Sequence, residues 1–340
     1  MIGCVEVDVL IVGGGPAGAA TAIACAQAGL SVTLVERGPT TSYRPGESLH
    51  PGIEPLLEQL GVMAAVASAG FPRYAGHWVQ WDSPRRFQAF GGDAHGTWRG
   101  FHAWRAEFER ILLDHAGKLG VSIRRHCQAG RVMSESGRIT GALTGDGLLR
   151  ARWVVDAAGG RHWLARQRNL AVARHSRPLA ITYGCVEGQG PDIDTAPFLR
   201  RTSGGWLWTV CVRPNTYAWV RLDLEHRYTA PPPELQALRP LCPIGGANTT
   251  WRVVAPMAGP GWFLVGDAAS VLDPVASHVM LKAVMTGMQT AHHIVRILRG
   301  GAPESVETTA YTTWVTRWFR HDTAALAELY GSTYSDLRSD

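Results

Sequence analysis

The sequence is poor in lysine and has no long apolar run, and each shortage excludes a class of protein. Lys118 and Lys282 are the only lysines, so the net charge of +5 comes from arginines that are dispersed along the chain. Because these arginines form no basic run, the positive charge does not indicate a nucleic-acid partner. No stretch reaches the length of about eighteen apolar residues that a membrane span needs. An apolar strand that begins within ten residues of Met1 also leads us to expect no signal peptide.

The cysteines are few and stand apart from one another. They form no Cys-x-x-Cys pair and have no histidine partners at zinc spacing, so we expect reduced thiols, no metal and a cytoplasmic location. At 340 residues with 46% apolar content, the chain can bury a sizeable core in two interleaved lobes. The six cysteines are Cys4, Cys25, Cys127, Cys185, Cys211 and Cys242.

A glycine-rich turn follows the first apolar strand, in the run Asp8-Val-Leu-Ile-Val-Gly-Gly-Gly-Pro-Ala-Gly. Gly13 allows a tight turn, Gly15 lets the backbone approach a pyrophosphate, and Gly18 lets helix and strand pack closely. The phosphates then lie at a helix N-terminus. Glu36 ends the next apolar run, where its carboxylate can accept a hydrogen bond from a ribose hydroxyl. The pattern predicts a dinucleotide-binding site.

A second strand-turn-helix pattern covers residues 261–274. An apolar strand leads to Gly266 and Asp267, where a carboxylate can accept a ribityl or ribose hydroxyl. Pro274 then opens a helix whose amides face an electron-rich ring. Because the two patterns lie more than 240 residues apart, they indicate one extended ligand that contacts both.

Three further segments accompany these two patterns. They are Arg44-Pro-Gly-Glu-Ser-Leu, the helix pattern of residues 104–112 with Arg105, and Val154-Val-Asp-Ala-Ala-Gly-Gly. From about residue 7 to about residue 300, the chain resembles the FAD-dependent oxidoreductases of the glutathione-reductase superfamily, in the branch of the aromatic hydroxylases, flavin-dependent halogenases and geranylgeranyl reductases. The resemblance implies FAD as the cofactor. It also implies that the three segments form the isoalloxazine-side loop, the arginine helix beside the flavin and the strand that returns to the FAD lobe.

The implied fold class is α/β, with a Rossmann-type FAD-binding lobe of the aromatic-hydroxylase kind interleaved with an antiparallel β-sheet substrate lobe. Spacing predicts helices over residues 51–62 and 103–119, and alternation predicts antiparallel strands between residues 179 and 223. The expected lobes are residues 1–60, 100–165 and 250–300 for FAD binding, residues 61–99 and 166–249 for the substrate, and residues 301–340 as a C-terminal helical segment.

The subfamily is indicated by two motifs that the chain lacks. Tryptophan halogenases of this branch have a Trp-x-Trp-x-Ile-Pro motif, and a lysine after the Gly-Glu-Ser loop handles hypohalous acid. Here Gly205-Trp-Leu-Trp-Thr-Val lacks Ile-Pro, and no lysine follows Ser48 until Lys118, which disfavours halogenation. Aromatic hydroxylases that take NADPH directly have an Asp-Gly motif where this chain has Asp156-Ala.

One helix start points to a narrower group. The run Asp273-Pro-Val-Ala-Ser-His, followed by Leu-Lys-Ala, looks most like the LodB- and GoxB-type flavoproteins, maturases that oxidise a tryptophan inside a partner polypeptide. Val279 departs from that pattern, because it stands where a small glycine is expected and narrows the space over the flavin. The resemblance implies an FAD-dependent monooxygenase that hydroxylates a tryptophan or similar aromatic side chain within a peptide or protein.

The chemistry leaves two alternatives open. Reduced flavin and O2 supply an electrophilic oxygen, and indole is an electron-rich acceptor; the reductant is NAD(P)H directly or a flavin reductase. The first alternative is a hydroxylase or halogenase-like enzyme for a free or carrier-bound small aromatic in secondary metabolism. The second is a non-catalytic flavin-binding escort of a client protein. In each case we expect a monomer or a homodimer.

The candidate site residues follow from these motifs. His278 at the start of the flavin-facing helix and His50 after the Gly-Glu-Ser loop are the candidate acid/base residues, with Glu47 to orient one of them. For each histidine the alternative is a structural bond to the backbone. The residues expected to bind FAD are Gly13, Gly15, Pro16, Ala17, Gly18, Glu36, Arg37, Arg44, Ser48, Arg105, Gly266, Asp267, Pro274 and Ser277.

Overall fold

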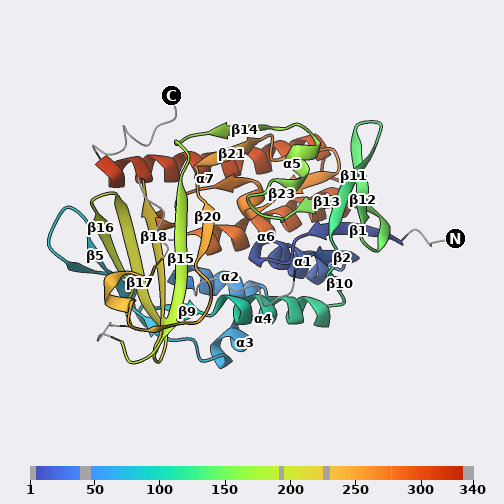
Figure 1. Cartoon of the computed structure of the whole chain (residues 1–340). Coiled ribbons are helices and arrows are strands. Elements are labelled where there is room, and N and C mark those ends of the chain that lie inside the picture. The colour runs from blue at the N-terminus through green and yellow to red at the C-terminus, as the bar shows by residue number, and fades with distance from the viewer. Residues whose placement is uncertain (1–4, 39–46, 191–194, 225–229, 277, 332–340) are drawn as a thin grey trace. The chain divides into compact units, whose positions relative to one another are not determined.

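The structure is a computed structural model that describes residues 5–38, 47–190, 195–224, 230–276 and 278–331 (Figure 1). The chain divides into two compact units, each with its own sheets and buried residues. The first unit contains Met1–Thr40, Glu109–Arg177 and Thr250–Asp340, and the second contains Thr41–Phe108 and Pro178–Thr249.

The first unit is built on a parallel sheet. Its central strand β1 (Val5–Val12) lies between β2 (Val32–Glu36) and β13 (Gly147–Asp156), and all three run in parallel. Strands β10 (Ser122–Arg125) and β23 (Trp262–Leu264) extend the parallel set beyond β2 and β13. The start of β13 also pairs with the antiparallel strands β12 (Arg138–Thr144) and β11 (Ala129–Glu135). The apolar run Val9–Val12 of β1 and the apolar residues Val32, Leu34 and Val35 of β2 are buried, as parallel strands covered on both faces require.

Helices pack beside this sheet. Helix α1 (Pro16–Gln27) follows β1 directly and contacts α6 (Val279–Leu298). The last helix, α7 (Glu304–Tyr330), lies along α6 (Figure 1). Tyr311, Val315 and Phe319 of α7 are buried, so its aromatic stripe is mainly core, while Trp318 is 41% exposed. The short elements of this unit are α5 (Trp163–Gln167), β14 (Ala171–Arg174), β21 (Arg252–Ala255), β22 (Ala258–Gly259), η3 (Gly266–Ala268), β24 (Ser270–Val271) and η4 (Pro274–Ala276).

The second unit is built on a mostly antiparallel sheet. Strands β15 (Ala180–Glu187), β18 (Thr216–Asp223), β17 (Gly205–Arg213) and β16 (Phe198–Thr202) pair in that order. Strand β5 (Gly76–Gln80) then joins β16 in parallel, and β6 (Arg86–Ala89) pairs with β5. Two short strands, β19 (Arg239–Pro240) and β20 (Gly245–Asn248), pair with β15.

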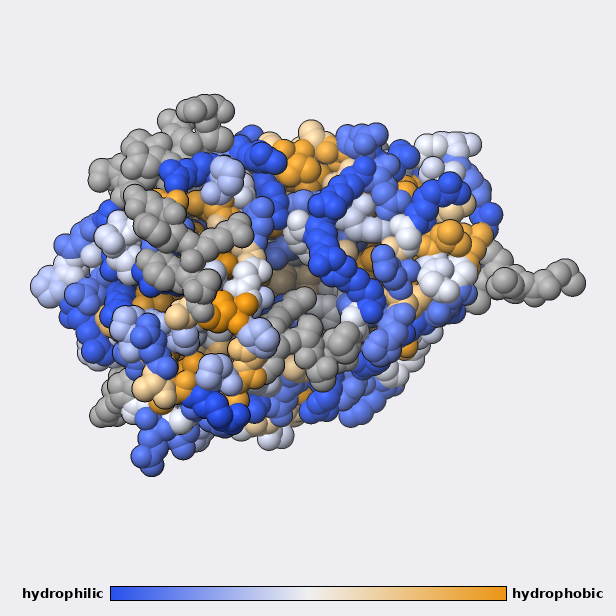
Figure 2. Space-filling model, viewed as in Figure 1, coloured by the Kyte–Doolittle hydropathy of each residue, from blue (hydrophilic) through white to orange (hydrophobic). Residues whose placement is uncertain are grey.

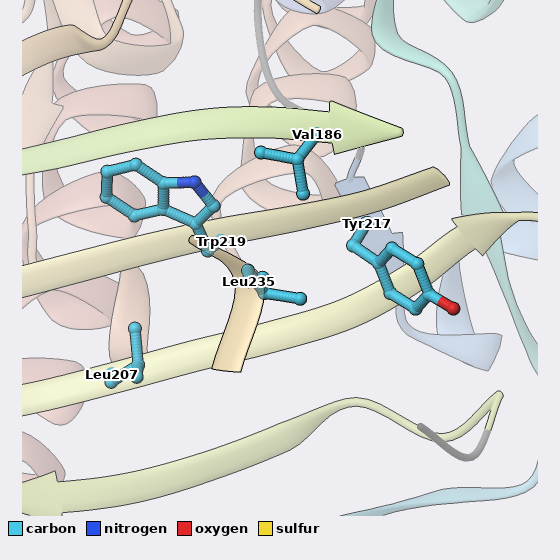
Figure 3. Packing of buried hydrophobic residues seen from close by; sticks show 5 residues of the cluster. All are labelled: Val186, Leu207, Tyr217, Trp219 and Leu235. Atoms are coloured by element: carbon cyan, nitrogen blue, oxygen red, sulfur yellow. The ribbon is translucent and has the colours of Figure 1, made fainter. Parts of the chain in front are cut away.

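Alternation explains which face of this sheet is covered. Tyr217 and Trp219 of β18, Leu207 of β17 and Val186 of β15 pack against Leu235 of η2 (Pro233–Leu235) (Figure 3). The remaining elements of the unit are β3 (Glu47–Leu49), η1 (Pro51–Ile53), α2 (Glu54–Gln59), α3 (Met63–Ser68), β4 (Arg73–Tyr74), β7 (Gly92–Asp93), β8 (Gly96–Thr97) and β9 (Gly100–Ala103). Helix α4 (Arg105–Lys118) begins in this unit and continues into the first unit, because the division falls after Phe108.

The α/β fold class is confirmed, but the boundaries between the units differ from those expected. Residues 41–60 and 100–108 belong to the second unit, because β3 and β4 pair with β9 in one small sheet. Residues 166–177 belong to the first unit, where β14 pairs with β21. The helix expected over residues 51–62 begins as η1 and ends as α2 at Gln59.

The face in Figure 2 is mostly hydrophilic, and the helices that the structure describes do not have the character of membrane spans. Hydrophilic residues cover most of the face in Figure 2, and apolar residues lie between them in separate patches. Of the helices in the described part of the chain, none combines the length and apolar character of a membrane span.

Candidate functional site

The turn between β1 and α1 has two glycines that no other residue can replace without a shift. Gly13 has φ +111°, and a Cβ added there would lie 2.4 Å from the Ala157 carbonyl oxygen. A Cβ on Gly18 would lie 2.0 Å from the Gly13 carbonyl oxygen. Gly15 is different, because an added Cβ would meet no described atom within 4 Å. Gly15 is also the N-cap of α1, and no side chain among the described residues caps the helix there. The first amides of α1 therefore face open space.

Glu36 lies at the end of β2 beside this turn. Its Oε2 accepts a hydrogen bond from the Gly14 amide at 2.7 Å, and its Oε1 accepts one from the Gly38 amide at 2.8 Å. These two bonds fix the carboxylate, and each oxygen keeps a second lone pair for a ligand hydroxyl. Arg37, the next residue, is exposed.

The second glycine turn lies beside the first. Gly266 opens η3 with φ +56°, and its amide donates to the Thr286 hydroxyl at 3.0 Å. A Cβ on Gly266 would lie 3.0 Å from the Ala17 Cβ, and a Cβ on Gly287 of α6 would lie 2.4 Å from the Ala17 carbonyl oxygen. The fold thus brings Gly266 and Asp267 next to the N-terminus of α1, although the two motifs are far apart in sequence.

The segment that leads into α6 is anchored by α7. Asp273 is fully buried; its Oδ1 accepts from the Val275 amide at 3.0 Å, and its Oδ2 accepts from the Tyr330 hydroxyl at 2.5 Å. Pro274 opens η4, as the sequence predicts. His278 is the N-cap residue of α6, whereas Ser277 lies outside the described residues.

Lys282, in the first turn of α6, is ion-paired with Asp322 of α7. Burial lowers the pKa of the Lys282 ammonium to about 8, and the facing carboxylate acts in the opposite direction. This pair ties the helix that carries His278 to α7.

His162 and Arg252 hold the back of the Gly266–Ala268 turn, and sequence reasoning missed both. Nδ1 of His162 donates to the Ala268 carbonyl at 3.0 Å, so its Nε2 accepts from Arg252 Nε at 2.8 Å. The remaining guanidinium nitrogens of Arg252 donate to the carbonyls of Thr250 and Gly160. Burial lowers the pKa of His162, and the Arg252 charge adds to the shift, so the imidazole is neutral. The two residues are 90 positions apart, so no local motif could have signalled the pair.

Asp156 fixes the turn onto which Gly13 packs. Its Oδ1 accepts from the Ala158 amide at 2.9 Å and its Oδ2 from the Leu164 amide at 2.8 Å. Burial raises the pKa of the Asp156 carboxyl to about 6, while these amides act in the opposite direction. The Val-Val-Asp-Ala-Ala-Gly motif was the available signal for this role.

In the second unit, the Ser48 segment is held by a buried histidine. The Ser48 hydroxyl contacts Nδ1 of His102 at 2.9 Å, and Nε2 of His102 donates to the Thr195 carbonyl at 2.6 Å. The carbonyl can only accept, so Nδ1 accepts from Ser48. Burial lowers the pKa of His102 to about 4. Tyr74 stacks on His102 with ring centroids 4.3 Å apart, and its hydroxyl donates to the Leu49 carbonyl at 3.2 Å.

The other candidates of this unit have more local roles. Nδ1 of His50 accepts from the Gly52 amide at 3.0 Å, which makes His50 the cap of η1, and burial lowers the pKa of His50. This contact supports a structural role for His50, the alternative to a role as acid or base. Glu47 pairs through its backbone with Ala103, and Arg105 is the first residue of α4. Arg44 lies outside the described residues.

The family model described as FAD binding domain matches residues 6–207. The chain belongs to this family. The match covers the first glycine turn with β2, Ser48 and the segment around Asp156, so FAD is the cofactor and the chain is an FAD-dependent oxidoreductase.

Relatives of this FAD-binding-domain protein include halogenases. It is 28% identical over 331 residues to the tryptophan 2-halogenase of Chondromyces crocatus. This alignment covers 86% of this chain and 62% of the relative. It is 26% identical over 355 residues to the 1H-pyrrole-2-carbonyl-(peptidyl-carrier protein) chlorinase of Pseudomonas fluorescens, which covers 89% of this chain and 77% of the relative. The chain is thus similar to FAD-dependent halogenases, and the narrower LodB/GoxB resemblance stays a hypothesis.

Solved structures show the same fold. The myxobacterial chondrochloren halogenase CndH superposes with a TM-score of 0.85 and 22% identity over 99% of this chain and 84% of that chain. The flavin-dependent halogenase CmlS superposes with a TM-score of 0.84 and 20% identity over 100% of this chain and 66% of that chain. At these identities the likeness establishes the fold.

The residues of the first unit fit FAD. The open space at Gly15, together with the uncapped amides of α1, suits a pyrophosphate. Glu36 binds the Gly14 amide, and Asp267 follows Gly266, which lies beside Ala17; both carboxylates can accept hydrogen bonds from hydroxyl groups. A side chain at Gly15 would occupy the space that the pyrophosphate needs.

Proposed function

We propose that this protein uses reduced FAD and O2 to oxidise a small, electron-rich aromatic ring of the indole or pyrrole type, either free or attached to a carrier. The observation that carries the proposal is the similarity to enzymes named for tryptophan and for carrier-bound pyrrole over 86% and 89% of this chain. The chain spans 62% of the length of the first relative and 77% of the second, so their substrates are used here as a guide to ring chemistry.

When bound, FAD would supply the oxidising chemistry. The residues of the chain bind the cofactor, hold or release a proton and orient a hydroxyl group. The N-terminus of α1 binds the pyrophosphate, and Glu36 and Asp267 accept hydroxyl groups of the two halves of the cofactor. His278, at the start of α6, is the candidate to hold or release a proton on the substrate ring. His102 orients the Ser48 hydroxyl and stays neutral, since burial lowers its pKa to about 4.

We assign oxygen as the group transferred. After Ser48, the first Lys or Arg of the sequence is Arg73, and the sequence has no lysine before Lys118. The Arg73 guanidinium is paired with Glu54 at 2.5 Å and donates to the Arg99 carbonyl at 3.0 Å. Arg73 also carries a guanidinium, whereas the group that handles hypohalous acid in tryptophan halogenases is a lysine ammonium.

The test is product analysis with a flavin reductase as electron source. Tryptophan, indole, pyrrole-2-carboxylate and a pyrrole-loaded carrier protein would be incubated with the FAD-loaded protein, with chloride, with bromide and without halide. We expect products that gain oxygen from labelled O2 and are the same with or without halide. A halogen in the product would show that the enzyme transfers halogen and not oxygen. If none of the four substrates gives a product, the proposal is contradicted.

A second candidate is oxidation of a tryptophan within a polypeptide. The sequence from Asp273 to Lys282, with its resemblance to tryptophylquinone maturases, favours it. The two candidates differ in the substrate they prefer. Rates would be compared for free tryptophan, a short tryptophan peptide and a folded tryptophan-containing client under identical reducing conditions. A higher kcat/KM for free or carrier-bound rings supports the main proposal, and a higher value for the polypeptide supports the second candidate.

A further inference from the structure

A polar pocket of about 450 Å³ lies within the second unit. It opens beside the sheet of β5, β16, β17 and β18, and no function described above uses it. Its lining includes aromatic, basic, hydroxyl and apolar side chains. They are Trp81, Arg200, Arg201, Thr202, Leu207 and Arg221.

Strand register puts two of the arginines on one face of the sheet. Arg200 of β16 is the partner of Leu207 of β17, and Leu207 is the partner of Arg221 of β18. Residues directly opposite on neighbouring strands point to the same face. The two guanidinium groups therefore flank Leu207. Arg201 also lines the pocket, but it follows Arg200 in β16 and pairs with Trp206, so its side chain begins on the opposite face of the strand.

The pocket wall is positive. Three arginines line it, and among the described residues that line it none is acidic. Each arginine also has a carboxylate partner elsewhere: Arg200 pairs with Glu234, Arg201 with Asp82, and Arg221 with Asp223 at 3.7 Å. These carboxylates balance the net charge of the arginines. The charged groups that line the pocket itself are still the guanidinium groups. A guanidinium has five N–H donors, so it can bind a carboxylate and a second anion together.

The rest of the lining suits a ligand with an apolar part. Leu207 belongs to the cluster with Trp219 and Leu235, so one side of the pocket continues into buried apolar side chains (Figure 3). The indole of Trp81 lies under the Arg201 guanidinium, 5.9 Å from its carbon to the ring centroid. The buried Thr202 hydroxyl has no hydrogen-bond partner among the described residues, and it is placed to donate to a ligand oxygen.

We propose that this pocket binds an anionic group of the substrate, a carboxylate or a phosphate, by means of Arg200 and Arg221. Planar guanidinium groups match both kinds of oxyanion, and the Thr202 hydroxyl completes the donor set. The inference rests on the proposed function, because a free aromatic amino acid offers a carboxylate and a carrier arm offers a phosphodiester. The pocket thereby determines how the substrate is presented to the protein.

Direct binding measurements test the pocket without turnover. Isothermal titration of the FAD-loaded protein would use two matched pairs of probes: tryptophan against tryptamine, which lacks the carboxylate, and pantetheine 4′-phosphate against pantetheine, which lacks the phosphate. We expect the anionic member of one pair to bind at least about tenfold more tightly than its neutral or cationic counterpart, with an affinity that falls as salt is added. The pair that shows this preference identifies the source of the anion.

Two variants locate the binding. Arg200→Gln removes one guanidinium, and the side chain of its Glu234 partner is 30% exposed, so water can solvate the remaining carboxylate. Thr202→Val keeps the side-chain shape and leaves all three charges. We expect the first to weaken binding of the preferred anion about tenfold and the second about threefold. Arg239→Gln is the matched control, because Arg239 is ion-paired with Glu187 on the same sheet but outside the pocket.

The outcomes separate this inference from the proposed function. Binding that is equal for both members of each pair, or unchanged in Arg200→Gln and Thr202→Val, would overturn the pocket assignment. An equal loss in Arg239→Gln would also overturn it, because that result reflects net charge alone. If the anion binds as expected but no aromatic ring is oxidised, the pocket stands and the proposed reaction fails.

Discussion

The two units fix their candidate functional segments in different ways. In the first unit, Gly13 and Gly18 allow backbone atoms to approach where a Cβ would lie within 2.4 Å of a carbonyl oxygen. In the second unit, the Ser48 segment is held by side chains, through the contact between the Ser48 hydroxyl and buried His102. A backbone contact of this kind depends on residue size, whereas a hydrogen bond to an imidazole depends on protonation. We therefore expect the first unit to respond most to added side-chain volume and the second to respond to acid.

The two buried histidines sharpen this comparison. Both are neutral, but His162 donates from Nδ1 and accepts at Nε2 from the permanent cation of Arg252, while His102 donates from Nε2 and accepts at Nδ1 from a neutral hydroxyl. Protonation of either one destroys an acceptor. The fold thus uses opposite tautomers of the same side chain, and the neighbouring carbonyl determines which nitrogen carries the hydrogen.

The largest expected effect comes from side-chain volume in the first unit. Gly13→Val places a branched Cβ at φ +111° and 2.4 Å from the Ala157 carbonyl oxygen, so we expect a loss of bound FAD. We also expect at least about 3 kcal/mol of lost stability, since backbone strain and a clash combine. Flavin absorbance of the purified protein and urea unfolding would measure the two effects.

Gly15→Ala is the matched control for that variant. Its Cβ meets no described atom within 4 Å, so the apo-protein should stay within about 1 kcal/mol of the parent. FAD affinity should still fall at least about tenfold, because the methyl group enters the space assigned to the pyrophosphate. Full retention of FAD by both variants would contradict the assignment of this turn.

An effect of similar size is expected from acid in the second unit. Burial lowers the pKa of His102 to about 4 from 6.5, so between these values the unfolded chain binds the proton more readily than the folded chain. The stabilising contribution is fully present above pH 6.5 and is lost as the pH falls to about 4. The loss amounts to about 3 kcal/mol. Urea unfolding at a series of pH values would measure it.

Two variants test the assignment of that pH dependence. His102→Gln keeps a donor and an acceptor but does not titrate, so its stability should change less between pH 6.5 and pH 4 than that of the parent. His95→Gln, at an exposed position, should leave the pH dependence unchanged. Parallel curves for the parent and His102→Gln would show that other groups cause the acid sensitivity.

The smallest effect tests whether a side-chain hydrogen bond also matters in the first unit. Tyr330→Phe removes the hydroxyl that donates to buried Asp273 at 2.5 Å, so we expect a loss of about 1–3 kcal/mol. FAD affinity should fall as well, because Asp273 immediately precedes Pro274. Thr313→Ala, on the exposed side of the same helix, should change stability by less than about 0.5 kcal/mol. Equal effects of the two variants would mean that general packing of α7, rather than this bond, holds the segment.

Local sequence patterns predicted much of the fold and the cofactor but only part of the site. The glycine turn, its strand and its helix lie within about thirty residues, so their geometry follows from residue size and backbone freedom. Helix α4 was expected over residues 103–119 and is found at Arg105–Lys118 for the same reason. The boundaries between the units could not be read in this way, because the pairing of β3 with β9 joins segments that are about fifty residues apart.

What the sequence alone determined is therefore the α/β class, FAD and the positions of Gly13, Gly15, Gly18, Gly266 and Asp267. Only the tertiary structure revealed the Arg252–His162 pair, the Ser48–His102 contact and the anchoring of Asp273 by Tyr330. Short motifs encode backbone conformations, which depend on neighbouring residues. Hydrogen bonds between buried polar groups join residues 54 to 90 positions apart, and their partners are selected only when the folded chain excludes water from them.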